Sequence, residues 1–126
     1  MNIPQNLKYS NDHEWVLVEG DIATVGVTDY AQKELGDIVY VEVDVVGETL
    51  EATDTFGTVE AVKTVADLLM PVSGEVLEKN ESLDDQPELI NSEAFDGGWI
   101  IKIKMSNPDE LDKLLSPEDY ASLIQA

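Results

Sequence analysis

The chain has 126 residues, with 27 acidic residues against seven basic ones and a net charge of −20. A chain of this length predicts one domain, over residues 1–126, that can bury roughly two-thirds of its unfolded surface. All seven basic residues are lysine, so the chain has no arginine to hold a phosphate or carboxylate in bidentate fashion. The charge therefore disfavours nucleic acid and anionic membranes as partners.

The chain also lacks the residues of several common catalytic and metal sites. It has no cysteine, which excludes disulfides, thiolate metal ligands and cysteine nucleophiles. Its one histidine, His13, argues against a histidine-based metal cluster and a Ser-His-Asp triad. No apolar run approaches the ~18 residues of a membrane span, and the segment Met1–Gln5 does not resemble a signal peptide. We therefore expect a cytoplasmic protein that is not a conventional enzyme.

The first part of the chain predicts short strands and one helix. Glu14–Glu19 and Asp21–Val27 predict a hairpin that turns at Gly20. A short helix is expected between Thr28, as its N-cap, and Gly36, as its stop. Over residues 37–45 apolar and other residues alternate, which predicts a strand in which four valines share one face: Val39, Val41, Val43 and Val45.

The second part predicts further strands and two capped helices. Strands are expected over Thr55–Val62, Val65–Met70, Glu75–Glu78 and Trp99–Met105, with one helical turn near Pro87–Ile90. In the last strand one face is predicted to hold Trp99, Ile101, Ile103 and Met105. Asn107 and Ser116 each precede a proline and acidic residues, as helix caps do. The final helix is expected to close the core through an apolar stripe of Tyr120, Leu123 and Ile124. Many short strands with frequent turns predict an antiparallel sandwich or barrel.

Lys63 is the candidate functional residue. It is the only basic residue between Lys33 and Lys79, and it follows a strand whose alternation fails at Ala61-Val62, which predicts a turn. A lysine at the tip of a hairpin is exposed, can be reached by a modifying enzyme, and is free to carry a long arm. From its spacing alone, Lys63 is better interpreted as an ordinary solvated surface lysine.

The segments around Lys63 resemble a known family. Gly57–Asp67 and Pro71–Val76 closely resemble the lipoylation segment of the glycine cleavage system H proteins. The resemblance extends in order over nearly the full length, through these further segments: Leu7-Lys8-Tyr9, His13–Val16, Val25–Gln32, Leu35–Glu42, Pro87–Ser92, Gly98–Lys104 and the tail from Glu110 to Tyr120.

The resemblance implies a mainly β fold, a flattened barrel-sandwich hybrid of two antiparallel sheets with short helices and a C-terminal helix. It also implies a non-catalytic carrier with lipoate in amide linkage to Lys63. The implied partners are a pyridoxal-phosphate glycine decarboxylase, a tetrahydrofolate-dependent aminomethyltransferase and dihydrolipoamide dehydrogenase. The first loads an aminomethyl group of glycine, the second removes it, and the third reoxidises the dithiol. A lipoate ligase, or a lipoyl or octanoyl transferase, would attach the cofactor.

The resemblance also implies roles for four further residues. Glu60, three residues before the lysine, and Gly74, in the following turn, are expected to be recognised by the ligase. We expect Gly74 to need a backbone conformation that a β-branched residue cannot adopt. Glu14 and Asp67 are expected to dock the arm, because a carboxylate attracts the cationic amine of the loaded form.

Other functions remain open at this point. A carrier that relays octanoyl or lipoyl groups to other proteins would use the same lysine, and the sequence does not separate it from a glycine cleavage carrier. A biotin carrier would have methionines on both sides of the lysine, whereas Val62 and Thr64 stand there. An enzyme would need His13 and Glu14 as an acid–base pair, but adjacent residues of a strand point in opposite directions.

Overall fold

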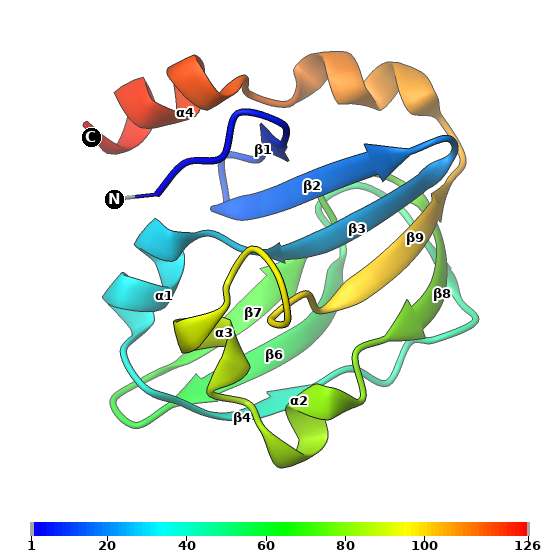
Figure 1. Ribbon diagram of the computed structural model, residues 1–126. Helices are drawn as coiled ribbons and strands as arrows, with labels where there is room; N and C mark the ends of the chain where they lie inside the picture. The colour runs from blue at the N-terminus through cyan, green and yellow to red at the C-terminus, as the bar shows by residue number, and fades with distance from the viewer. Residues whose placement is uncertain (1, 126) are drawn as a thin grey trace.

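Two antiparallel sheets form the body of the molecule in the computed structural model, which describes residues 2–125 (Figure 1). Met1 and Ala126, the ends of the predicted domain, lie outside the described residues. The six-stranded sheet has the order β1 (Lys8–Tyr9), β2 (Glu14–Glu19), β3 (Ile22–Val27), β9 (Ile101–Met105), β8 (Gly74–Lys79) and β5 (Thr49–Leu50). The three-stranded sheet has the order β4 (Ile38–Glu42), β6 (Thr55–Ala61) and β7 (Val65–Leu69).

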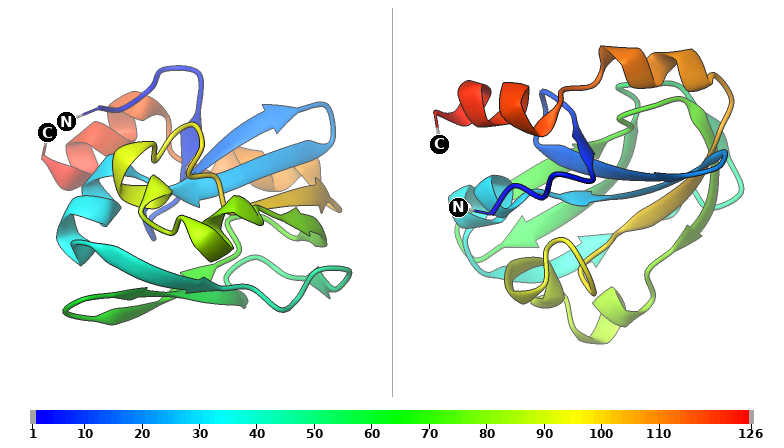
Figure 2. Two further views of the ribbon diagram at one scale, coloured as in Figure 1. Left: turned by 60° about the horizontal axis from the view of Figure 1, so that its bottom comes forward. Right: turned by 45° about the horizontal axis from the view of Figure 1, so that its top comes forward.

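Short helices connect and cover these sheets. They are α1 (Asp29–Leu35), α2 (Ser82–Asp85), α3 (Leu89–Ser92), the 3₁₀ helix η1 (Pro108–Lys113) and α4 (Pro117–Ile124). Helices η1 and α4 run along the β1–β2 side of the larger sheet, and the three-stranded sheet forms a separate layer on the other side (Figure 2). The predicted mainly β fold of two antiparallel sheets with a C-terminal helix is confirmed. No helix of residues 2–125 is both long enough and apolar enough to cross a membrane.

The core lies between the two sheets and is built from strand residues that alternate inward. Val25 and Ile103 of the larger sheet are fully buried, and so is Val59 of the smaller one. A second apolar cluster lies on the other face of the larger sheet, under α4, where Tyr9 and Tyr120 stack with ring centroids 4.7 Å apart. Burial of this kind is worth about 1.5–3 kcal/mol per large side chain. The C-terminal helix is therefore held by its own small core.

Local signals placed most of the turns and caps correctly. Gly20 has φ +66° and joins β2 to β3, as predicted. The Thr28 hydroxyl accepts from the Ala31 N–H at the start of α1, and the N–H of Gly36 donates to the Gln32 carbonyl at its end. Asn107 caps η1 and Ser116 caps α4, although the first of these helices is 3₁₀. These confirmed signals are local, because each depends on one side chain and the next three residues.

The predicted face of residues 37–45 is wrong at its beginning. A β-bulge interrupts the pairing of β4 with β6 between Ile38 and Tyr40. Ile38 is buried and Val39 is 52% exposed, while Val41 and Val43 point inward. An extra residue in one strand moves every later side chain to the opposite face, so a strict alternation fails there.

Two further expectations about packing are corrected. Trp99 precedes β9 and packs in the second cluster, so it does not share the face of Ile101 and Ile103. The Lys102 ammonium lies over its ring, 5.1 Å from the ring centroid. Leu123 is 48% exposed, and α4 is anchored by Tyr120 and Ile124 instead. Helix α2 was not predicted, and the helical turn near Pro87–Ile90 lies slightly later, as α3.

Candidate functional site: a lysine at a hairpin tip beside an acidic cleft

Lys63 lies at the tip of the hairpin that joins β6 to β7. The N–H of Ala61 donates to the carbonyl of Thr64 over 2.7 Å and closes a two-residue loop of Val62 and Lys63. The Val62 N–H donates to the carbonyl of Asp37 over 3.0 Å, so the loop is also tied to the start of β4. The predicted turn after Ala61 is confirmed, and Lys63 is exposed.

The stem of the Lys63 side chain leans against the end of α1. A Cβ atom placed on Gly36 would lie 3.3 Å from Lys63 Cε and 3.8 Å from Nζ. Gly36 has φ +83° and ends α1, so the backbone favours a residue without a side chain there, and the lysine stem occupies the space beside it. Within residues 2–125 the ammonium of Lys63 forms no ion pair. The amine is therefore open to chemistry.

A cleft of about 200 Å³ lies between α1 and the free edge of β7, the strand that follows this hairpin tip. We call it the α1–β7 cleft. Its walls are mostly apolar, and its ionisable groups come from the loop before β2, from the first residue of β2, from α1 and from β7. Its lining residues are Asp12, His13, Glu14, Val27, Tyr30, Ala31, Glu34, Leu35, Val59, Ala66, Asp67 and Leu68.

Glu14 and Asp67 both line this cleft although they belong to different sheets. Glu14 begins β2, and Asp67 lies on β7, the edge strand of the smaller sheet. The Leu69 N–H at the free edge of β7 donates to Glu14 Oε2 over 3.3 Å, which links the two sheets directly. Glu14 and Asp67 thus line one cleft because the free edge of β7 faces the other sheet, and not because their strands are neighbours.

The carboxylate of Glu14 is only 3% exposed. Burial raises its pKa to about 7, and the nearby charge of Asp12 adds to this effect. The Ser10 hydroxyl, which donates to Oε1 over 2.7 Å, and the Leu69 N–H oppose it by stabilising the charged form. Burial thus disfavours the charged form of the Glu14 carboxyl, and a cation beside it would stabilise that form.

His13 also lines the cleft, which corrects the expected geometry. We expected His13 and Glu14 to point in opposite directions from one strand, but β2 begins only at Glu14. His13 has φ +68°, the left-handed region, and this backbone turn brings both side chains to the same cleft. Its ring packs on Tyr30, with centroids 4.9 Å apart.

Comparison with known proteins identifies the family of the chain. The family model for "Glycine cleavage H-protein" matches residues 7–126. The chain belongs to the glycine cleavage H-protein family. It is 56% identical over 124 residues to a glycine cleavage system H protein of Bacteroides thetaiotaomicron, with 98% of each chain covered. It is 54% identical over 126 residues to that of Bacteroides fragilis, with both chains fully covered.

A solved structure shows the same fold. The H protein of Mycobacterium marinum matches with a TM-score of 0.90 and 35% identity, over 98% of this chain and 100% of the other. H proteins are the lipoyl carriers of the glycine cleavage system, so the predicted family and carrier function are confirmed.

The two residues predicted to meet the ligase lie in very different places in this H-protein fold. Glu60 is exposed and pairs with Tyr40 on one side and Val65 on the other. Gly74 is buried at the start of β8, which belongs to the other sheet. It does not have positive φ, so the expected backbone requirement is wrong. A Cβ atom there would overlap the backbone carbonyl oxygen of Lys104, so the close packing of β8 against β9 is what requires glycine.

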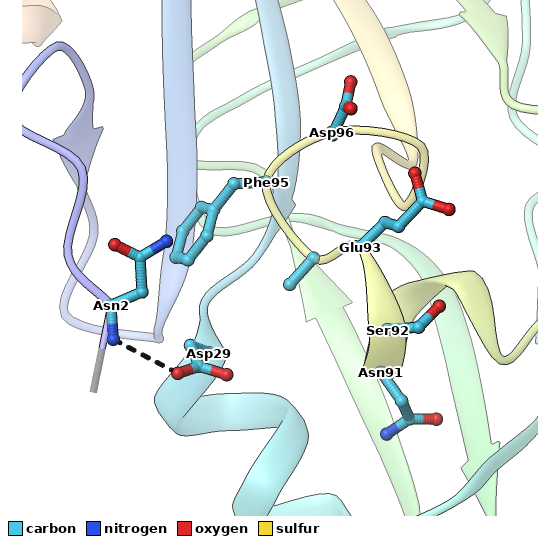
Figure 3. A pocket seen from close by; sticks show the side chains of 8 residues that line it. Asn2, Asp29, Asn91, Ser92, Glu93, Phe95 and Asp96 are labelled. Carbon is cyan, nitrogen blue, oxygen red and sulfur yellow. Dashed lines mark hydrogen bonds between the residues drawn. The ribbon is translucent and has the colours of Figure 1, made fainter.

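A larger hollow of about 340 Å³ lies beside the N-terminal end of α1 (Figure 3). Asp29 accepts from the Asn2 N–H there over 3.2 Å, and Glu93 and Asp96 come from the segment after α3. The lining of this hollow is more polar than that of the α1–β7 cleft, and none of it comes from α1's C-terminal end, where the Lys63 stem lies. The smaller cleft is the better receptor for a mostly hydrocarbon chain.

The apolar walls of the α1–β7 cleft were not predicted as a site. Ala31 and Leu35 of α1 face Ala66 and Leu68 of β7 across it, and each of these residues alone reads as an ordinary core position. The turn-forming run Ser10-Asn11-Asp12 before His13 was a usable signal, because such residues favour tight turns and left-handed neighbours. It would have placed His13 outside the strand.

Proposed function

We propose that Lys63 carries lipoate in amide linkage and that the α1–β7 cleft receives the loaded arm. The observation that supports this proposal best is an exposed lysine, without an ion pair in residues 2–125, whose stem lies against the end of α1. The same helix forms one wall of a cleft that contains the buried carboxyl of Glu14. The chain itself acts as a carrier and not as a catalyst. When bound, lipoate supplies a disulfide that accepts the aminomethyl group of glycine together with two electrons.

The residues present fit such a group. The lysine stem already lies along Gly36, at the end of the helix that forms one wall of the cleft. From the hairpin tip, β7 extends over the five residues Val65–Leu69, roughly 16 Å at ~3.3 Å per residue, and ends where the Leu69 N–H meets Glu14. A flexible aliphatic arm can follow this strand with its chain against Leu35, Ala66 and Leu68.

Glu14 and Asp67 then hold the cationic end of the loaded arm. An ammonium near Glu14 favours the charged carboxylate and so lowers the pKa that burial has raised. The electrostatic gain is larger here than at the surface because the carboxyl is almost completely buried. Withdrawal from water also protects a carbon that bears both sulfur and nitrogen, which otherwise decomposes readily.

The remaining surface suits a carrier that meets several enzymes in turn. We propose glycine decarboxylase, aminomethyltransferase and dihydrolipoamide dehydrogenase as its partners in the cytoplasm, with a lipoate ligase or a lipoyl or octanoyl transferase acting first. The net charge of −20 steers the chain toward basic surfaces on these enzymes. We propose that Glu60 contacts the modifying enzyme directly, whereas Gly74 acts through the packing of β8 against β9.

The test is the mass of the protein purified from its native host. We expect one lipoyl increment on the peptide that contains Lys63, together with glycine–bicarbonate exchange when the decarboxylase is added. A biotin increment, or an unmodified Lys63 in cells that lipoylate their other carriers, would contradict the proposal.

A further inference from the structure

Exposed apolar side chains gather around Lys63. Seven large apolar residues of the described chain are exposed, and four of them lie at the hairpin tip or on the adjacent part of β4. They are Val39 (52% exposed), Tyr40 (47%), Val62 (75%) and Val65 (63%). Isolated apolar residues are common on surfaces, but a group of them marks a contact site.

The strand register puts these residues on one surface. Tyr40 pairs with Glu60, and Glu60 pairs with Val65, so the three side chains form a row across β4, β6 and β7. Paired residues of neighbouring strands point to the same face, with Cβ atoms about 5 Å apart. The neighbouring inward row, Val41, Val59 and Ala66, lies on the opposite face of the sheet, toward the core and the cleft.

The β4 bulge contributes to this surface. Without it, the alternation of residues 37–45 would put Val39 inside with Val41. The bulge between Ile38 and Tyr40 turns Val39 outward, next to the row. We call Val39, Tyr40, Glu60, Val62 and Val65 the outer tip surface.

We propose that the outer tip surface is the docking site of the enzyme that acylates Lys63, a partner with an apolar contact area bordered by basic residues. This proposal rests on the proposed function. Basic residues on the partner enzyme would complement the carboxylates of Glu60 and Glu42, which lie on this same face of the sheet. The net charge of −20 also favours a basic partner.

The length of the lipoyl arm indicates which partner enzyme contacts the outer tip surface. An enzyme that acylates Lys63 must bring its reacting carbon to Nζ itself, so its surface has to contact the few residues around the hairpin tip. An enzyme that acts on the far end of a finished arm does not have to approach this tip. The proposed path of the arm runs along the edge of β7 against Ala66 and Leu68, and no residue of the outer tip surface lines the α1–β7 cleft.

Acylation of Lys63 needs an activated acyl group as its co-reactant. Lys63 Nζ forms the amide bond with the acyl carbon of an acyl adenylate or thioester. The bond from that carbon to the phosphate or sulfur breaks, and its electron pair leaves on that group. The lysine ammonium releases two protons in becoming the amide nitrogen.

The test compares two sets of three substitutions on the full chain. The first set is Tyr40→Thr, Val62→Thr and Val65→Thr, which removes the apolar surface and keeps strand-forming residues. The control set, Val46→Thr, Leu77→Thr and Leu123→Ser, removes the same number of exposed apolar side chains elsewhere. Initial rates of lipoate transfer by lipoate ligase with ATP are measured by mass spectrometry, beside melting curves.

We expect kcat/KM for the carrier to fall about tenfold or more in the first set, mainly through KM, and to stay within about twofold in the control set. The single variants Val62→Thr and Val65→Thr should show the same direction, which protects the test against a triple variant that fails to fold. Equal ligase kinetics in both sets would overturn the proposal.

A second measurement separates the modifying enzyme from the later partners. The variants are fully lipoylated with excess ligase and then assayed with glycine decarboxylase, where we expect kcat/KM within about twofold of the wild-type value. A defect with the decarboxylase and none with the ligase would overturn the proposal and assign the surface to the later enzymes. If the wild-type chain accepts no lipoate at all, the proposed function fails, and this proposal fails with it.

Discussion

The imidazole Nδ1 of His13 lies 2.9 Å from the hydroxyl of Tyr120, 107 residues further along the chain. The same hydroxyl lies 2.6 Å from Thr28 Oγ1, which in turn accepts from the Ala31 N–H as the N-cap of α1. One hydroxyl on the C-terminal helix is therefore connected both to a residue that lines the α1–β7 cleft and to the start of its helical wall. Tyr120 does not line the cleft itself.

The hydrogens of this network have a preferred order. If Thr28 donates to Tyr120 and Tyr120 donates to His13 Nδ1, both hydroxyl hydrogens are used and the proton of the neutral imidazole is on Nε2. The reverse order would leave the Thr28 hydrogen without the Tyr120 oxygen as acceptor. Burial lowers the pKa of His13, with the charges of Asp12 and Glu34 partly opposing this, so the neutral ring fits its surroundings.

Tyr120→Phe tests this network. The ring can still stack on Tyr9, but the hydroxyl that stabilises neutral His13 is lost, so we expect the pKa of His13 to rise. Thr28 also loses a buried partner, which should cost about 1–2 kcal/mol of stability. NMR titration of the imidazole in the unlipoylated protein measures the pKa. Tyr30→Phe, which keeps the other ring against His13, is the control, and an unchanged His13 titration in Tyr120→Phe would refute the arrangement.

Lys63→Arg should abolish lipoylation and leave the fold intact. Arginine keeps the positive charge, but its guanidinium does not form the lipoyl amide. At an exposed hairpin tip we expect a change of less than ~0.5 kcal/mol in the free energy of unfolding. Glycine–bicarbonate exchange and a melting curve are the measurements, and Lys33→Arg serves as the control. Exchange activity in the Lys63 variant at the wild-type level would remove Lys63 from the site.

Glu14→Gln should change how stability depends on pH. The folded pKa of Glu14, about 7, lies above its ordinary value of 4.5, so the folded state holds this proton more tightly than the unfolded state does. The resulting stability is fully present below about pH 4.5 and is lost as the pH rises through 7. Between pH 5 and pH 8 the wild type should therefore lose about 2–3 kcal/mol more than the variant. Urea unfolding of both proteins at both pH values measures this difference, and parallel losses would show that Glu14 ionises normally.

Glu14→Gln and Asp67→Asn should accept lipoate normally but hold the loaded arm less well. Loss of a charge-assisted hydrogen bond of about 1.5 kcal/mol corresponds to roughly tenfold weaker docking. We expect faster release of formaldehyde from the aminomethyl-loaded protein, measured without the transferase. Glu42→Gln, which removes an exposed carboxylate of the smaller sheet that does not line the α1–β7 cleft, is the matched control. Equal decay in all four proteins would mean that these carboxylates do not shelter the arm.

Gly74→Ala should act on the fold and only thereby on modification. The new Cβ would overlap the Lys104 carbonyl oxygen, so β8 and β9 must separate, at a cost of about 2 kcal/mol or more. We expect a lower melting temperature, with lipoylation reduced only near the melting transition. Thr58→Val, within β6, is the control. A stable Gly74→Ala protein that the ligase modifies poorly would instead place Gly74 in contact with the enzyme.

Several features were determined by the sequence alone because their causes are local. Thr28, Asn107 and Ser116 each cap a helix within three residues of themselves, and Gly20 supplies the backbone of a tight hairpin. The exposed turn at Lys63 followed from a break in alternation over two residues. Alternation also identified most strands, since its period does not depend on which strand lies beside which.

Only the tertiary structure decided the rest, because the causes lie in contacts between distant segments. The bulge in β4 depends on its pairing with β6, so Val39 could not be placed outside from its own sequence. The α1–β7 cleft exists because the free edge of β7 faces Glu14 of the other sheet, 55 residues away in the chain. His13 reaches that cleft through one left-handed residue and is held there by Tyr120. A sequence read by itself gives the residues that carry chemistry, whereas the distances between them are set by packing over long range.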